Sequence, residues 1–131
     1  MRNRGSAVLL RENKIALIKR IREGSTYYVF PGGGMEEGET PEQATKREVY
    51  EELGVQINII RYIASLHYHG VQHYFLAEIT EGEFGTGIGE EFTDLDRNRG
   101  IYKPMWVEAN HLSSIDVRPK EMAEKVTNML K

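Results

Sequence analysis

The chain holds 131 residues, of which 17 are Lys or Arg, 20 are Asp or Glu, 40% are apolar and none is Cys. This length predicts a single domain over residues 1–131, and the lack of cysteine excludes disulfides, thiolate metal sites and a cysteine nucleophile. With no signal-peptide core, no membrane-spanning run and a net charge of −3, we expect a cytoplasmic protein without a membrane or general nucleic-acid partner.

Three strands are predicted in the first part of the chain. Apolar-rich runs at Ser6–Arg11 and Lys14–Ile21, separated by Glu12-Asn13, indicate two strands joined by a tight turn. Thr26–Phe30 is dense in β-forming residues and predicts the third strand. Pro31-Gly32-Gly33-Gly34 ends this strand, and we expect these residues to form a turn.

A helix is predicted directly after the glycine turn. Thr40 is a suitable N-cap, Pro41 suits the first helical position, and Gln43 completes a capping box. Gly54 follows the last residue of the helical pattern and provides its C-terminal stop.

The middle of the chain predicts a long hairpin followed by a long loop. Gln56–Tyr68 and Val71–Ile79 alternate apolar and polar residues on either side of Gly70. Thr80–Gly100 holds five glycines mixed with acidic residues and shows little periodicity. Loops of this length are uncommon unless they have a function, so we expect a mobile lid.

The last part of the chain predicts a strand and a final helix. Ile101–Val107 has a strand pattern in which Pro104 suggests an edge position, and Ala109–Leu112 predicts a short helical turn. The final helix is expected to start around Pro119. Its apolar positions follow helical spacing and indicate core packing: Met122, Val126, Met129 and Leu130. Strands before, between and after two helices predict an α+β fold with a mixed sheet.

Charge is segregated along the chain: the first 34 residues carry +5, the next 18 carry −5, and the remaining 79 carry −3. In the acidic segment, Glu48, Glu51 and Glu52 share one face of the predicted helix, whereas Val49 and Leu53 occupy another face suited to packing against the sheet. Like charges at this spacing destabilise a helix, so three converging carboxylates predict a divalent cation such as Mg²⁺. A solvated acidic face is the alternative.

Arg47 and the glycine turn complete this candidate site. Arg47 lies four residues before Glu51, where its guanidinium can orient a carboxylate. Gly32 and Gly33 lack a Cβ, so their backbone groups can approach a substrate closely, and a glycine-rich turn before a helix suits phosphate. The alternative is a tight connection without a ligand.

These residues form one longer motif. Gly33 is followed after five residues by Glu39, and after seven more by the run Arg47-Glu48-Val49-Tyr50-Glu51-Glu52-Leu53-Gly54-Val55. The pattern resembles the complete signature of the Nudix hydrolases, with every fixed position filled. The preceding Tyr28-Val29-Phe30-Pro31-Gly32-Gly33 is similar to the segment that comes before this signature in many members.

The resemblance implies a Nudix-type α/β/α sandwich with a mixed β-sheet between helices, and an activity that depends on Mg²⁺ or Mn²⁺. It implies that Glu39 and Arg47 hold the helix and the loop in register, with Gly33 and Gly54 as structural positions of the motif. By position, it assigns metal binding or water activation to the carboxylates of Glu48, Glu51 and Glu52 and to the carbonyl of Gly33.

The general base stays open among three glutamates. Glu48 is one, and together with Arg47 and Glu51 it belongs to the residues that we expect to take part in catalysis. Some family members use a glutamate from a later loop, which here makes Glu90 and Glu91 candidates because they lie on the predicted lid. The alternative is that both are solvated loop acids.

Substrate contacts are predicted from the strands before the glycine turn. Arg20 and Arg22 share one strand face, opposite Lys19, and are suited to bind phosphates. Tyr28 is a candidate to stack on a nucleobase, although core packing is the commoner role of such aromatics; the others are Tyr27, Phe30 and Trp106. His67 and His69, expected on one strand face, and His73 are interpreted as surface or hairpin histidines rather than metal ligands.

The resemblance implies Mg²⁺-dependent hydrolysis of a diphosphate linkage in a nucleoside diphosphate derivative, and a metal-activated water is the expected nucleophile. The alternative is a catalytically inactive regulatory Nudix domain that binds a nucleotide, against which the three retained glutamates argue. Trimming of RNA 5′ ends is a third hypothesis, supported only by the basic N-terminal third. The particular substrate and the formation of a homodimer are left open.

Overall fold

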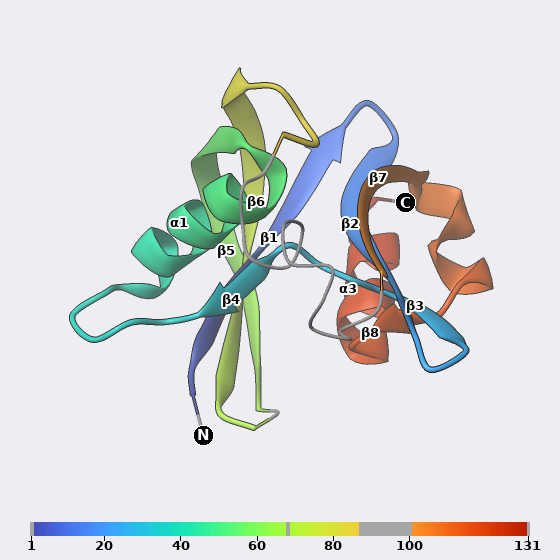
Figure 1. Cartoon of the computed structure of the whole chain (residues 1–131), viewed down its shortest axis with the longest axis horizontal. Coiled ribbons are helices and arrows are strands. Elements are labelled where there is room, and N and C mark those ends of the chain that lie inside the picture. The colour runs from blue at the N-terminus through green and yellow to red at the C-terminus, as the bar shows by residue number, and fades with distance from the viewer. Residues whose placement is uncertain (1, 68, 87–100, 131) are drawn as a thin grey trace.

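The computed structural model describes residues 2–67, 69–86 and 101–130. Its strands are β1 (Arg4–Arg11), β2 (Lys14–Arg22), β3 (Ser25–Val29), β4 (Gly32–Gly34), β5 (Val55–His67), β6 (Val71–Gly82), β7 (Ile101–Glu108) and β8 (Val117–Arg118). Its helices are α1 (Pro41–Leu53), the 3-10 helix η2 (Ala109–Ser114) and α3 (Lys120–Met129). In the described ranges the strands form one mixed sheet in the order β5-β6-β1-β2-β3-β8, with β4 paired to β1 and β7 paired to β2 (Figure 1).

Strand β1 lies at the centre of this sheet. It pairs in parallel with β6, where Arg4 lies opposite Gln72, and antiparallel with β2 at its other end, where Leu10 lies opposite Ile15. Its first residues also pair antiparallel with β4, so that Arg4 lies opposite Gly34. The start of the chain is therefore held between β6 and β4, which we call the glycine strand because it consists of Gly32, Gly33 and Gly34.

Two apolar clusters cover the two faces of the sheet. Val49 and Leu53 of α1 pack in one cluster with Leu9, whereas Met122 and Val126 of α3 pack in the other. Successive side chains of a strand point to opposite faces, and β1 accordingly supplies both clusters. Figure 1 shows α1 against one part of the sheet and α3 with η2 against another, which confirms the predicted α+β fold with a mixed sheet between helices.

Most predicted elements are present within a residue or two of their expected bounds. The two helices, the hairpin about Gly70 and the strand beginning at Ile101 are confirmed. Pro104 lies on β7, which pairs with β2 alone among the described strands, in agreement with its predicted edge position. Met122 and Val126 are fully buried as expected.

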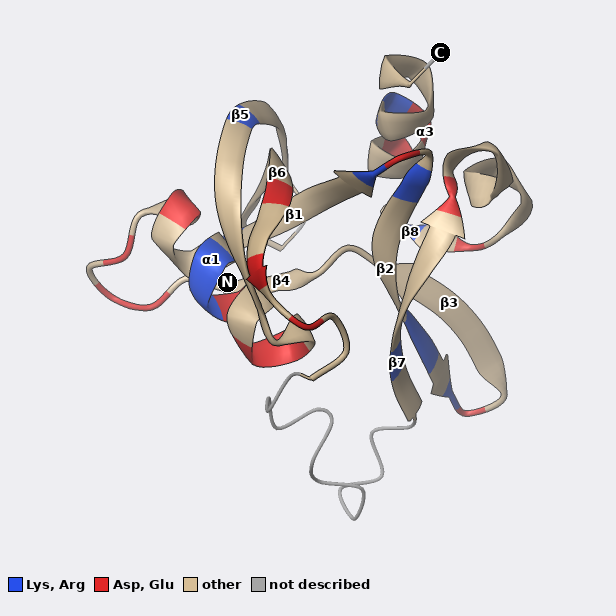
Figure 2. Ribbon diagram, turned by 90° about the horizontal axis from the view of Figure 1, so that it is seen from above, with Lys and Arg blue, Asp and Glu red and all other residues tan. Residues whose placement is uncertain are grey.

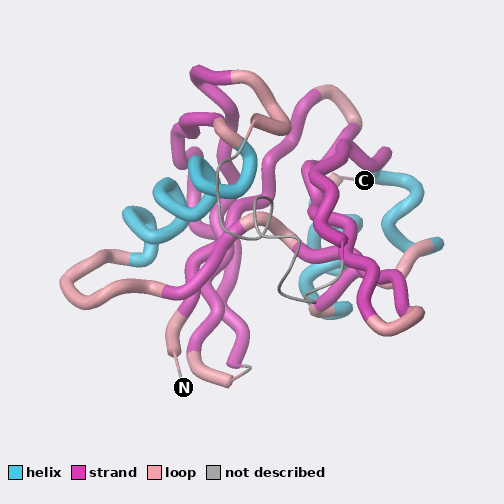
Figure 3. Tube along the Cα trace, viewed as in Figure 1, coloured by secondary structure: helices cyan, strands magenta, loops and turns pink. Residues whose placement is uncertain are grey.

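Two expectations about elements are wrong, and one strand was not predicted. The predicted glycine turn is the short strand β4, and the two-residue strand β8 was not expected (Figure 3). The predicted loop starts too early, because β6 continues through Thr80 to Gly82. The rest of that loop from residue 87 to residue 100, including the base candidates Glu90 and Glu91, lies outside the described residues.

None of the helices in the described ranges combines the length and the apolar character needed to cross a lipid bilayer.

Candidate active site

Helix α1 is fixed at both ends by the residues that predicted it. The Thr40 hydroxyl accepts a hydrogen bond from the Gln43 backbone N–H at 3.1 Å, and the Gln43 side chain accepts one from the Thr40 N–H at 2.9 Å. Gly54 takes a φ of 77° and its N–H donates to the Tyr50 carbonyl, a conformation that glycine adopts without strain. These caps set the position of every glutamate on the helix.

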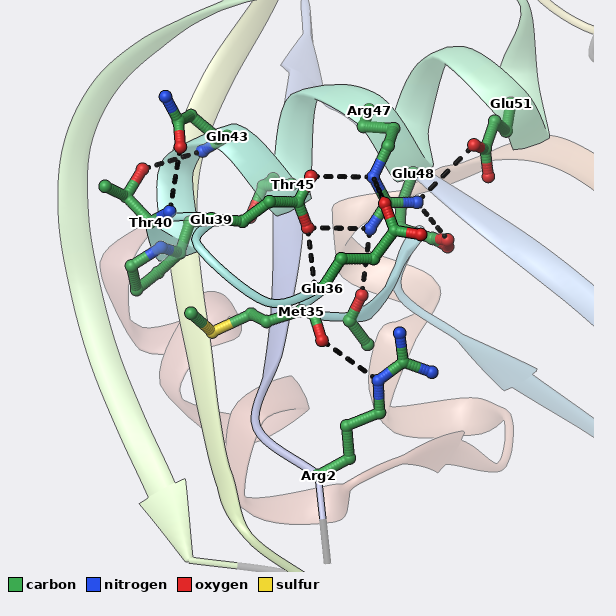
Figure 4. Close-up of polar contacts among 12 residues, drawn as sticks. Arg2, Met35, Glu36, Glu39, Thr40, Gln43, Thr45, Arg47, Glu48 and Glu51 are labelled. Atoms are coloured by element: carbon green, nitrogen blue, oxygen red, sulfur yellow. Dashed lines mark hydrogen bonds and ion pairs between the residues drawn. The ribbon is translucent and has the colours of Figure 1, made fainter.

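Arg47 connects the helix to the segment before it (Figure 4). Its Nε and Nη2 donate to the two carboxylate oxygens of Glu39 at 2.7 and 2.9 Å, and Nη2 also donates to the Gly34 carbonyl at 2.9 Å. Nη1 donates to Glu48 at 3.1 Å and to Glu51 at 3.4 Å. One guanidinium therefore holds β4, the loop before the helix and two acidic side chains of α1.

The Glu39–Arg47 pair is strongly ionised. Hydrogen bonds from Arg47, followed by one from the Glu36 backbone, lower the pKa of Glu39 from 4.5 to about 2. The same contact raises the pKa of Arg47 above its ordinary value, with further contributions from the Glu48 charge. Both groups therefore keep their charges over the whole range in which an enzyme normally works.

Glu52 and Glu48 face the glycine strand from the helix. Glu52 is buried, and its Oε1 accepts a hydrogen bond from the Gly32 N–H at 2.7 Å. The Glu48 carboxylate lies so close to Gly33 that a Cβ at this position would collide with it. The absence of a side chain at Gly33 thus leaves the space that the Glu48 carboxylate occupies.

The three motif carboxylates do not converge on one point in this conformation. Glu51 turns toward Arg47 and is 42% exposed, whereas Glu52 is directed to β4. Across the part of the chain that the structure describes, no three His, Cys, Asp or Glu side chains are close enough to hold a metal ion. Glu48 and Glu52 nevertheless line one cavity, and their hard oxygen donors fit Mg²⁺ in chemical type.

Two cavities meet at the glycine strand. The smaller, of about 290 Å³, is lined by β4, Glu48 and Glu52 together with Arg4 and Arg20. The larger, of about 770 Å³, also has Arg4 and Arg20 in its wall and extends to the start of α3. Figure 2 shows the acidic residues of α1 and of the preceding segment on one side of the molecule, with basic residues on β2 and β7.

The predicted substrate residues differ in where they lie. Arg20 lines both cavities, whereas the exposed Arg22 at the end of β2 lines neither. Tyr28 packs against the core cluster that contains α3, and its neighbour Tyr27 lines the larger cavity. Because side chains alternate along a strand, only one of these two tyrosines can face the cavity.

Of the remaining aromatic and histidine candidates, Phe30 and His69 line the cavities, and the others contact a neighbouring ring or lie at the surface. Phe30 is a core residue in edge contact with Tyr74, and Trp106 contacts Phe84 with ring centroids 4.9 Å apart. His73 is 3.0 Å from the Tyr62 hydroxyl, and His67 is exposed at the end of β5. The expected shared strand face of His67 and His69 is wrong, because His69 lies beyond β5, where it lines the larger cavity.

Sequence reasoning missed several basic residues at the cavities. Arg2 and Arg4 line both, and Arg118 and Lys120 line the larger one. Only the excess of positive charge in the first 34 residues hinted at Arg2 and Arg4. No local signal marked Arg118, because the pairing of β8 with β3 brings it there from a distant part of the chain.

The family model of the NUDIX domain matches residues 1–125, and the chain belongs to this family. It is 52% identical over 44 residues to the RNA pyrophosphohydrolase of Aliivibrio fischeri, which covers 34% of this chain and 26% of that protein. It is 32% identical over 108 residues to the NAD-capped RNA hydrolase NudC of Photobacterium profundum, over 80% of this chain and 37% of that protein.

The chain thus spans well under half the length of these two curated relatives. Among solved structures, a MutT NUDIX hydrolase from Burkholderia pseudomallei matches with a TM-score of 0.73 and 25% identity, over 96% of this chain and 98% of that one. The resemblance seen in the motif is therefore confirmed for the family and for the fold.

Proposed function

We propose that this chain hydrolyses a diphosphate linkage in a nucleoside diphosphate derivative, using Mg²⁺ or, as a substitute, Mn²⁺. The observation that carries the proposal is the smaller cavity, where Glu48 and Glu52 lie beside Arg4 and Arg20. Carboxylates suit a divalent cation and arginines suit phosphate oxygens, so both parts of a metal–diphosphate complex have partners.

The names of the relatives support the same type of reaction. One is called a pyrophosphohydrolase and another a hydrolase of NAD-capped RNA. Both proteins are much longer than the segment that matches this chain, so their names support a type of reaction and not a particular substrate. A cytoplasmic location and a homodimer stay predictions.

Glu48, Glu51, Glu52 and the Gly33 carbonyl are the groups that would hold the metal. When bound, a divalent cation neutralises charge on the diphosphate and lowers the pKa of a coordinated water. Glu52 is held in place by the Gly32 N–H, and Arg47 orients the carboxylates of Glu48 and Glu51.

The proton of the attacking water needs an acceptor, and Glu48 is the described candidate. Its carboxylate lies at the glycine strand and accepts a hydrogen bond from Arg47, which positions it beside the cavity. Glu90 and Glu91 stay proposals from the sequence. A double substitution of both to Gln that leaves turnover unchanged would remove them from the mechanism.

A panel of nucleoside triphosphates, dinucleotides and nucleotide sugars tests the proposed activity. Purified protein with Mg²⁺ or Mn²⁺ is expected to release a nucleoside monophosphate or diphosphate from at least one of them, measured by chromatography. Binding of a nucleotide without turnover of any substrate would favour the regulatory domain instead.

The substitution Glu52→Gln tests the role of the carboxylate charge. Gln retains an oxygen that can accept the Gly32 hydrogen bond, so the helix–strand contact is kept while the negative charge is lost. We expect kcat to fall by about 10²-fold or more. Glu37→Gln, at an exposed position before the helix, is the matched control and is expected to keep kcat. Activity of Glu52→Gln close to wild type would contradict the metal assignment.

A further inference from the structure

The larger cavity is strongly basic although it extends away from the carboxylates. Its wall includes five cationic side chains and one carboxylate, that of Glu121. The cations come from separate parts of the chain, brought together by the sheet and by the start of α3: Arg2, Arg4, Arg20, Arg118 and Lys120. Cations that face a common space repel one another, so such a site favours an anionic ligand.

Three of these arginines, Arg2, Arg4 and Arg20, take part in none of the ion pairs in the described ranges, and Arg2 donates to the Met35 carbonyl instead. Arg20 donates from Nη2 to the Tyr102 hydroxyl, and its buried Nε lacks a hydrogen-bond partner among the described residues. A buried donor without a partner is costly, and a phosphate beside Arg20 would compensate the charge of its guanidinium group.

Aromatic rings position the guanidinium groups along this wall. The Arg20 guanidinium carbon lies 4.3 Å from the ring centroid of Tyr102 and 5.5 Å from that of Tyr27. Arg118 lies 4.2 Å from the centroid of the same Tyr27 ring and also pairs with Asp116 at 2.9 Å. Cation–π contacts use the planes of the guanidinium groups, whereas hydrogen bonds to an anion use their N–H edges.

The same contacts make the cavity a poor site for a nucleobase. The Tyr27 ring is already covered by two guanidinium groups, and Phe30 and Tyr74 are buried core residues in contact with each other. Stacking needs an accessible ring face, and the burial of Phe30 and Tyr74 leaves little of theirs. The chemistry of the wall is therefore that of a phosphate site.

We propose that the larger cavity binds a second phosphate group of the substrate, separate from the diphosphate that is cleaved beside Glu48 and Glu52. This inference rests on the proposed function and specifies its substrate class. Arg4 and Arg20 line both cavities and would contact the path between the two phosphate positions, whereas Arg118 and Lys120 line only the larger one. The second phosphate is either a terminal 3′-phosphate or an internucleotide phosphate.

Binding measurements separate this inference from catalysis. Isothermal titration calorimetry with Mg²⁺ compares three probes that share one base: adenosine 5′-monophosphate, adenosine 3′,5′-bisphosphate and the dinucleotide pApA. We expect the wild-type protein to bind at least one two-phosphate probe about tenfold or more tightly than the monophosphate, as two charge-assisted hydrogen bonds allow. In the double variant Arg118→Gln/Lys120→Gln, we expect the affinity for the two-phosphate probes to fall close to that for the monophosphate.

Lys125→Gln is the matched control, because Lys125 is exposed on the same helix and lines neither of these two cavities. It is expected to retain the ratio of affinities, which would exclude a general effect of net charge.

The probe that binds more tightly identifies the kind of phosphate. Tighter binding of the bisphosphate alone identifies a terminal phosphate, and tighter binding of pApA alone identifies an internucleotide phosphate. Tighter binding of both supports a site that accepts either. Equal affinities for all three probes, or a ratio unchanged in the double variant, would overturn the inference. Failure of the proposed function is a different result, namely no turnover of any substrate in the panel of nucleoside triphosphates, dinucleotides and nucleotide sugars, whatever the binding ratio.

Discussion

Arg47 is the residue on which the arrangement of the carboxylates depends. Its fork reaches Glu39, the Gly34 carbonyl and two glutamates of α1 from a side chain that is 26% exposed. Lysine has the same charge but a single donor group, which cannot reproduce a planar fork.

The substitution Arg47→Lys should therefore destabilise the protein while the charge is kept. We expect the free energy of unfolding to fall by about 2 kcal/mol, because several charge-assisted hydrogen bonds are lost and only some are replaced. Urea denaturation followed by circular dichroism measures this change. Lys46→Gln, at an exposed position of the same helix, should stay within about 0.5 kcal/mol of wild type. Equal stability of Arg47→Lys and wild type would show that the fork has no structural role.

The lowered pKa of Glu39 predicts how the stability of the folded protein depends on pH. Its pKa is about 2 in the folded protein and 4.5 as the ordinary value, so folding favours the ionised form. The stabilisation is fully present above about pH 4.5 and is lost as the pH falls toward about 2. Unfolding curves of wild type and Glu39→Gln should differ most at neutral pH and approach each other in this acidic window. A difference that stays constant down to about pH 2 would contradict the assignment.

At the scale of single residues, the sequence was sufficient to predict contacts between residues that are neighbours along one helix. The acidic face, the contact of Arg47 with Glu51 and the cap by Thr40 follow from spacing along one helix. It could not decide between Tyr27 and Tyr28, because a period of two tells which residues share a face but not which face meets the cavity.

Strand β4 shows how two adjacent glycines serve different purposes. A Cβ on Gly32 would collide with the backbone of Gly5 and Ser6 on the paired strand, which cannot move away without breaking the sheet. A Cβ on Gly33 would collide with the Glu48 side chain, which can rotate. The first glycine is therefore required by the fold, and the second by the site.

The pair Gly32→Ala and Gly33→Ala tests this distinction. Gly32→Ala should lower the free energy of unfolding by about 2–3 kcal/mol through overpacking. Gly33→Ala should lose less stability but weaken Mn²⁺ binding about tenfold or more by displacing Glu48, as changes beside a metal ligand do. Chemical denaturation and calorimetric titration of Mn²⁺ measure the two effects. Equal behaviour of both variants in both assays would refute the distinction.

Among the elements, capped and periodic segments were predictable, whereas those made by pairing were not. Helix α1 carries its own start and stop signals, and the bounds agree with them. Strands β4 and β8 exist because β1 and β3 supply their partners. Glycine has a low β propensity, so nothing within residues 32–34 indicates a strand.

The whole molecule places an acidic helix and a basic cavity on either side of the glycine strand. The net charge of −3 hides this arrangement, because opposite charges cancel in the sum. The segregation along the chain was visible in the sequence, but the contribution of Arg118 and Lys120 required the fold. Attraction of a polyanionic substrate then depends on the local field of the cavity rather than on net charge.

Salt should therefore weaken substrate binding more than it slows the chemical step. We expect KM for a nucleotide substrate to rise about tenfold between about 50 mM and about 500 mM KCl, as screening shortens the range of the arginine charges. Steady-state kinetics at several salt concentrations measures this, with kcat changing much less. Arg4→Gln should make the dependence shallower, and Lys125→Gln should not. A KM that is independent of salt would contradict a binding role for the basic cavity.

Arg4, Arg20 and Arg118 are carried by the paired strands β1, β2 and β8 rather than by loops. Their backbones are fixed before any ligand arrives, and cation–π contacts already restrict the side chains of Arg20 and Arg118. The loss of conformational entropy that usually accompanies the ordering of long cationic side chains has thus largely been incurred during folding. A larger share of the attraction to each phosphate therefore remains as binding free energy, and the site is preorganised by the sheet itself.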